Sequence, residues 1–152
     1  MSTHRVSILR ILSAVLLAGW LSACGGNGEA AAPPEPEKPA ATKVTAALLE
    51  QGAQVYKVNC VACHGPLGKG DGPSSGTLDP KPRDHTNREY MDNIPDQQVA
   101  DTIVQGGAQR GYPNMPSNPH IKGQDLVALV AHVRTLSRGV EEVAEVNLVA
   151  KQ

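Results

Sequence analysis

Three stretches of the chain repeat small or apolar residues at the spacing of an α-helix. The first runs from Thr45 to Cys60, with such residues at every fourth position from Leu48 onward. The second begins at Ile94-Pro95-Asp96 and stops at Gly106-Gly107, and the third runs from Gln124 to Leu136. Threonine is a common N-cap, proline suits the first helical turn, and glycine ends helices. These spans therefore predict three helices.

The segments between these helices are expected to be loops. Residues 65–87 and 108–123 are dominated by Gly, Pro, Asn, Asp and Ser, and neither contains a convincing alternating strand pattern. The fold class expected is therefore all-α with long loops. Loops longer than about 12–15 residues are uncommon in compact domains unless they have a function. We expect them to wrap a cofactor.

Composition narrows the class of protein. The chain has 152 residues, about one domain, with 14 Lys plus Arg against 15 Asp plus Glu. This near-neutral balance lacks the basic excess of a nucleic-acid-binding protein. Aromatic residues are few: one Trp, three Tyr and no Phe. A core so short of large side chains needs another apolar group to complete it.

The N-terminus is expected to direct export. Residues 1–23 combine a basic start, carrying Arg5 and Arg10, with an apolar stretch too short to span a membrane, which is typical of a signal peptide. The alternative is a short retained anchor helix. Leu21-Ser22-Ala23-Cys24 resembles a bacterial lipobox, which implies a lipoprotein lipidated at Cys24. Residues 24–43, rich in Gly and then in Pro, Ala and Glu, predict a flexible tether.

Cys60-Val61-Ala62-Cys63-His64 is the c-type haem attachment pattern. Two thiols one helical turn apart can add to the two vinyl groups of one haem, and the adjacent imidazole becomes an axial ligand of the iron. A thioredoxin-like redox pair would need a βαβ context, and a zinc site would need a convincing fourth ligand. The chain has three cysteines, so one is assigned to lipid and two to haem.

From about Leu49 to Leu136 the chain resembles the class I c-type cytochromes, which are small monohaem electron carriers. The resemblance rests on the haem motif and on four further segments. These are Gly52-Ala53-Gln54-Val55-Tyr56, Gly70-Asp71-Gly72-Pro73 with Pro82-Arg83-Asp84, Asn114-Met115-Pro116, and residues 129–136. It implies a cytochrome c fold, with three main helices and long loops around one covalently bound haem. It also implies that Gly52 permits a close crossing with the last helix. His132 departs from the aromatic residue usual there.

The cytochrome domain is expected at residues 44–138, followed by a C-terminal tail at 139–152. We expect this tail to fray, with a docking helix as the alternative.

The sixth iron ligand is expected to be Met115, which follows His64 by 51 positions. Pro113 and Pro116 stiffen the backbone on either side of its flexible thioether. Four alternatives stay open: Met91, His85, His120 and His132.

Two supporting roles are also expected. The His64 imidazole should donate its second ring nitrogen to a backbone carbonyl. By resemblance Pro73 supplies it, with Pro80 and Pro82 as alternatives. Arg83 is expected to pair with a haem propionate, because a planar guanidinium matches a carboxylate; the alternative is a solvated surface arginine.

The expected function is one-electron transfer by a tethered monomeric carrier with His/Met ligation, not an enzyme. We place it on the periplasmic side of a bacterial membrane, between respiratory complexes or between a dehydrogenase and an oxidase. Gly25 replaces the aspartate that by resemblance marks inner-membrane retention, which weakly favours the outer membrane. The alternatives are a haem subunit of a larger oxidoreductase, or a haem protein that binds peroxide, NO or CO at an open sixth site.

Overall fold

The computed structural model describes residues 38 and 40–149. The chain divides into two units, 1–33 and 34–152, and every described residue belongs to the second. The expected signal peptide at 1–23, the expected lipidation site Cys24 and most of the expected tether therefore lie outside the described residues. Within the described part of the chain, no helix is both long enough and apolar enough to span a bilayer.

The three predicted helices are present. They are α1 (Ala46–Asn59), α4 (Asp96–Gln105) and α5 (Gln124–Arg138). Thr45 caps α1, because its hydroxyl accepts a hydrogen bond from the Leu48 amide at 3.2 Å. Gly106 ends α4 at φ 85°, a backbone conformation that glycine adopts without strain. Pro95 stands at the N-cap of α4, one position before its expected place in the first turn.

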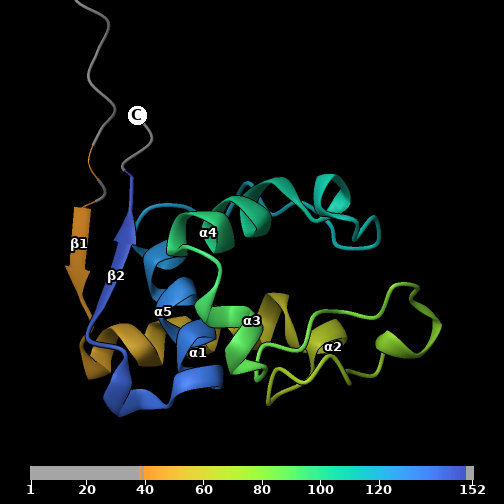
Figure 1. The fold of residues 1–152 in the computed structure, drawn as a ribbon, viewed down its shortest axis with the longest axis horizontal. Coiled ribbons are helices and arrows are strands. Elements are labelled where there is room, and N and C mark those ends of the chain that lie inside the picture. The colour runs from red at the N-terminus through yellow and green to blue at the C-terminus, as the bar shows by residue number, and fades with distance from the viewer. Residues whose placement is uncertain (1–37, 39, 150–152) are drawn as a thin grey trace, which may run out of the picture. The chain divides into compact units, whose positions relative to one another are not determined.

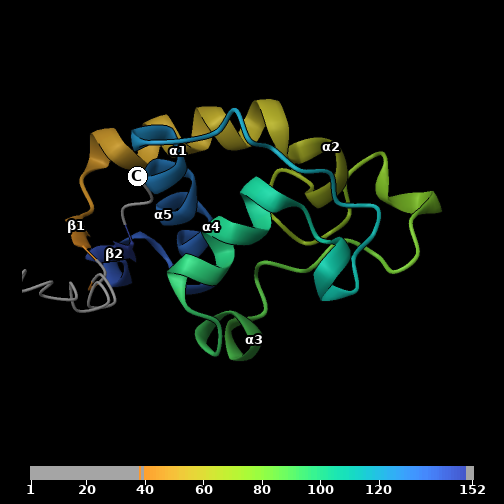
Figure 2. The same cartoon turned by 90° about the horizontal axis from the view of Figure 1, so that it is seen from above.

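Helices α1 and α5 pack directly against each other (Figure 2). The buried face of α1 carries Leu48, Gly52 and Tyr56. An ideal Cβ on Gly52 would lie 2.1 Å from the carbonyl oxygen of Ala128 on α5, far inside van der Waals contact. The expectation that Gly52 permits a close crossing is confirmed. Shorter elements complete the helical part: α2 (Val61–His64), α3 (Arg88–Asp92), η1 (Ser75–Thr77), η2 (Ala108–Arg110) and η3 (Val140–Glu142).

A two-stranded antiparallel ribbon joins the two ends of the domain (Figure 1). Strand β1 (Ala40–Lys43) pairs with β2 (Glu145–Leu148), with Ala40 opposite Leu148 and Lys43 opposite Glu145. Val146 of β2 is fully buried against the core.

The ribbon lies outside the expected domain limits of 44 and 138. Residues 40–43 of the expected tether and 145–148 of the expected tail form strands of the same domain. The expected frayed tail packs through Val146, and the alternative docking helix is replaced by a strand. The physical reason is pairing across the whole domain, which four-residue strands do not reveal by their own pattern.

Candidate functional site

The site begins where α1 ends. Cys60 closes α1, with its amide donating to Tyr56 O at 2.9 Å, and its own carbonyl accepts the His64 amide at 2.9 Å. The single turn of α2 therefore separates the two thiols of Cys60 and Cys63. The Tyr56 hydroxyl donates to the carbonyl of Gly65 at 3.0 Å, which ties the end of α2 back to α1.

A cavity, partly open to solvent, lies beside this turn. Cys60, Cys63 and His64 all line it. Its apolar walls come from the η1–α3 loops, α4 and α5, and include Leu78, Ile94, Val99, Ile103, Leu129 and Val133. The cavity therefore offers a large planar group an apolar surface, with two thiols at one side.

His64 is held in a defined tautomer. Its Nδ1 lies 3.0 Å from the carbonyl oxygen of Arg83. A carbonyl only accepts, so Nδ1 carries the proton and donates, leaving the lone pair on Nε2 free. Burial lowers the pKa of His64, which keeps the ring neutral, while the hydrogen bond to Arg83 opposes that shift. A neutral imidazole oriented by a backbone carbonyl is the usual state of a metal-ligating histidine.

The prediction that Pro73 supplies this carbonyl is wrong, and so are the alternatives Pro80 and Pro82. The residues on either side of Pro73 are tied to α2: Gly72 N donates to Cys63 O at 3.1 Å, and Ser74 N donates to Ala62 O at 2.8 Å. This pairing holds Pro73 against the α2 backbone, and Pro73 does not line the cavity. The acceptor is Arg83, 19 residues beyond His64.

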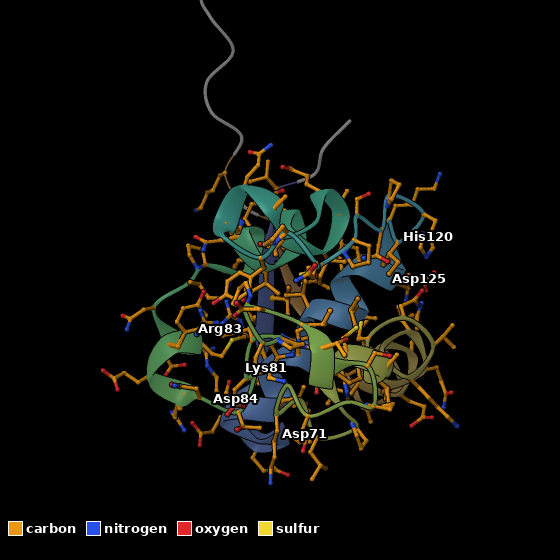
Figure 3. The ribbon with its side chains drawn as sticks, turned by 90° about the vertical axis from the view of Figure 1, so that its right-hand side faces the viewer. Asp71, Lys81, Arg83, Asp84, His120 and Asp125 are labelled. Carbon is orange, nitrogen blue, oxygen red and sulfur yellow. The ribbon has the colours of Figure 1, made fainter. Side chains whose placement is uncertain are left out.

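Three of the five sixth-ligand candidates line the cavity: Met115, Met91 and His85. The other two do not. His120 is exposed, with Nε2 3.2 Å from Asn59 Oδ1, and Figure 3 shows it at the edge of the face, apart from Arg83. The His132 ring lies against Tyr56, with a centroid separation of 5.0 Å.

The loop of Met115 is fixed at both backbone groups. The Met115 carbonyl accepts the Gly107 amide at 3.1 Å, and its own amide donates to Tyr112 O at 3.1 Å. A Cβ on Gly107 would lie 2.9 Å from the Cβ of Met115, so the loop sits tightly on the end of α4. This packing holds Met115 at the cavity, although it is 51 positions away from His64 in the chain.

Arg83 faces the cavity between two tyrosines. Its guanidinium carbon lies 3.9 Å from the ring centroid of Tyr90 and 5.1 Å from that of Tyr112, and it donates a hydrogen bond to the Tyr112 hydroxyl. Its Nε is buried and has no partner among the described atoms. Buried polar groups are normally paired. This orphaned donor fits an acidic group held in the cavity.

His85 was expected only as an alternative sixth ligand, and its contact with His64 was not predicted from the sequence. Its ring stacks on that of His64, with centroids 4.2 Å apart and an angle of 18° between the planes. Burial is the main reason that its pKa falls to about 3, so the ring is neutral. The available sequence signal was Asp84-His85-Thr86, since an Asp followed two residues later by Thr favours an ordered turn.

These residues fit a covalently attached haem. Two thiols and a neutral imidazole meet at one end of a large apolar cavity, and the Met115 side chain and the Arg83 cation line the same space. Burial, and secondarily Cys63, raises the pKa of Cys60 to about 11. The free Cys60 side chain is therefore a thiol at neutral pH.

Comparison with known proteins agrees with this assignment. The family profile described as "Cytochrome c" matches residues 49–137, more than half of the chain. A search of curated proteins finds no significant match. The chain therefore belongs to the cytochrome c family, whose haem c is held covalently through a Cys-x-x-Cys-His motif, here Cys60, Cys63 and His64.

Proposed function

We propose that this cytochrome is a membrane-tethered one-electron carrier whose haem iron is ligated by His64 and Met115. The observation that supports it best is that residues 51 positions apart line one cavity. His64 lies there at the end of α2 with Nε2 unprotonated, and Met115 lies on a loop that is hydrogen-bonded to Gly107.

When bound, haem c supplies a one-electron couple at its iron. The chain's own residues set the conditions for that couple. Cys60 and Cys63 would hold the group covalently, and the Arg83 guanidinium, whose Nε has no partner among the described atoms, would pair with a propionate. Thioether ligation raises the potential of haem iron. Apolar walls from α4 and α5 would limit the contact of the bound group with water.

The tether adds a location to this role. Fifteen positions, 25–39, separate Cys24 from β1. Fully extended they reach roughly 50 Å. If Cys24 is lipidated, the domain samples partners close to one membrane on its periplasmic side. Such partners are redox proteins: respiratory complexes, or a dehydrogenase and an oxidase.

Ligation is tested by a pair of methionine variants. Both Met115 and Met91 line the cavity, so Met115→Leu and Met91→Leu remove the same thioether from different walls. We expect the weak long-wavelength band of the ferric His/Met haem to disappear only in Met115→Leu, and reduced Met115→Leu to bind CO. Loss of the band in Met91→Leu instead would show that Met91 on α3 is the sixth ligand. A wild-type protein that binds CO when reduced would favour the ligand-binding alternative.

Tethering is tested separately at Cys24. We expect wild-type protein expressed in a bacterium to incorporate labelled fatty acid and to sediment with membranes. The variant Cys24→Ser should lose the label. Unlabelled wild-type protein would remove the tether from the proposal and leave the haem chemistry unaffected.

A further inference from the structure

We propose that His85 is a positioning residue that fixes the plane of the His64 ring by stacking on its face. This inference rests on the proposed role of His64 as an iron ligand. It concerns how the ligand is oriented, which the ligand assignment itself leaves open.

The hydrogen bond of His64 constrains only one edge of the ring. Nδ1 donates to Arg83 O at 3.0 Å, and the ring can still tilt about that contact. The second constraint is the near-parallel His85 ring, at 4.2 Å and 18°. An edge contact and a face contact together define a plane. Both come from one short segment, because Arg83 and His85 are two residues apart.

The segment that presents His85 is itself anchored. The His85 amide donates to Gly68 O at 2.7 Å, in the loop that follows the haem motif. Across His85, Asp84 Oδ1 accepts hydrogen bonds from both the amide and the hydroxyl of Thr86, at 2.8 and 2.7 Å. Tyr56 meets the ring edge-on, with centroids 6.4 Å apart. His85 therefore rests on fixed backbone, so its ring can hold another ring in place.

The His85 side chain contacts His64 through the face of its ring. Its Nδ1 is buried and has no partner in the described part of the chain. A buried unpaired nitrogen is unfavourable, so a phenyl ring, which has no such atom, should serve at least as well. This separates a stacking role from any role that needs the nitrogen.

The plane of an axial imidazole has a direct spectroscopic consequence. In low-spin ferric haem it helps to determine, together with the second axial ligand, which iron orbital holds the unpaired electron, and hence how spin is distributed over the four ring methyl groups. Their paramagnetic proton shifts therefore report the orientation of His64. A residue that only stabilised the fold would leave their order unchanged.

The test compares His85→Phe with His85→Leu in the mature haem protein. Phe keeps a flat ring, whereas Leu fills similar volume without one. We expect Phe to retain the wild-type order of methyl shifts and Leu to change that order and to shift the reduction potential. The exposed His120→Ala serves as a control and should match the wild type.

Two results would overturn the proposal. Wild-type shifts in His85→Leu would show that the stack does not orient His64. Equal changes in the Phe and Leu variants would show that the nitrogen matters and not the face. If His85→Leu retains no haem, His85→Phe alone decides, because a changed order there contradicts stacking. Failure of His64 ligation appears differently, as a wild-type spectrum without a low-spin imidazole-ligated haem.

Discussion

Gly52 and Ala128 bring α1 and α5 closer than any side chain at position 52 allows, since a Cβ there would lie 2.1 Å from Ala128 O. The crossing has a functional consequence one turn further along α1. Tyr56, buried in the same interface, donates to Gly65 O at 3.0 Å and so fixes the turn that carries the haem motif. Burial raises the pKa of Tyr56, so its hydroxyl remains a donor at neutral pH.

Replacing Gly52 by Ala should therefore destabilise the protein. The added methyl group must push α1 away from a backbone carbonyl, and overpacking of this kind costs typically about 1–3 kcal/mol. Denaturant unfolding followed by helix signal and by haem absorbance measures the loss. Gly76→Ala is the matched control, because a Cβ at Gly76 meets nothing within 4 Å. Equal effects of the two substitutions would contradict the close crossing.

Arg134 is a buried cation that connects α5 to α3 and α4. Its Nε donates to Asp96 Oδ1 at 2.7 Å, and its other nitrogens donate to the carbonyls of Ile94 and Met91. The side chains of Arg134 and Asp96 are 2% and 13% exposed. Removing one member of a buried pair leaves the other uncompensated, which costs roughly 3–5 kcal/mol.

We expect Arg134→Met to lower the free energy of unfolding by an amount in that range. Arg138→Met on the same helix removes a more exposed pair, Arg138 with Asp92, and should change the free energy of unfolding far less. Urea unfolding of the two variants separates the stability contributed by the buried ion pair from that contributed by the exposed one. A loss in Arg134→Met no larger than in Arg138→Met would show that the buried pair contributes little net stability.

The lowered pKa of His132 predicts that the stability of the protein depends on pH. Burial lowers this pKa below the usual value of 6.5. Above pH 6.5 the ring is neutral in both the folded and unfolded states and contributes no slope. As pH falls below 6.5, the unfolded state binds a proton that the folded state resists, so stability decreases until the folded pKa is reached.

The variant His132→Phe should lack this contribution. Below pH 6.5 the wild type should lose stability through His132, whereas the variant should not. The free energy of unfolding of the variant minus that of the wild type should therefore be larger below pH 6.5 than at pH 8. Unfolding curves at several pH values measure this directly. A difference between the two proteins that stays constant with pH would show that His132 titrates alike when folded and unfolded.

Local patterns predicted much of this fold, and nonlocal contacts account for the misses. The helices were predictable because one buried face imposes a 3.6-residue period, and the attachment residues Cys60, Cys63 and His64 because they share one turn. The acceptor for His64 was not predictable from a side-chain type, since any residue in a loop can offer a carbonyl. The stack of His85 on His64 likewise depends on the path of a 20-residue loop. Met115 was expected at the site because Asn114-Met115-Pro116 resembles the distal-ligand loop of the family and because prolines flank it.

Strand β2 contributes a buried side chain to the core of the domain. Val146 is 0% exposed, although it lies beyond the expected end of the domain. Beside it, the amide of Asn147 donates to Asp96 Oδ2 at 2.8 Å, so β2 is held by α4 as well as by β1. Val146→Ala removes two buried methyl groups, worth about 0.8 kcal/mol each, and should cost roughly 1.6 kcal/mol.

Val58→Ala is the matched control for this loss, since Val58 is 81% exposed and should change little. Both variants are compared by denaturant unfolding with the haem band as the probe. If Val146→Ala proves as silent as Val58→Ala, the ribbon does not belong to the cooperative fold. If it is destabilising, residues 145–148 are part of the domain that unfolds together with the haem cavity, and truncation after Arg138 should be more damaging than the single substitution.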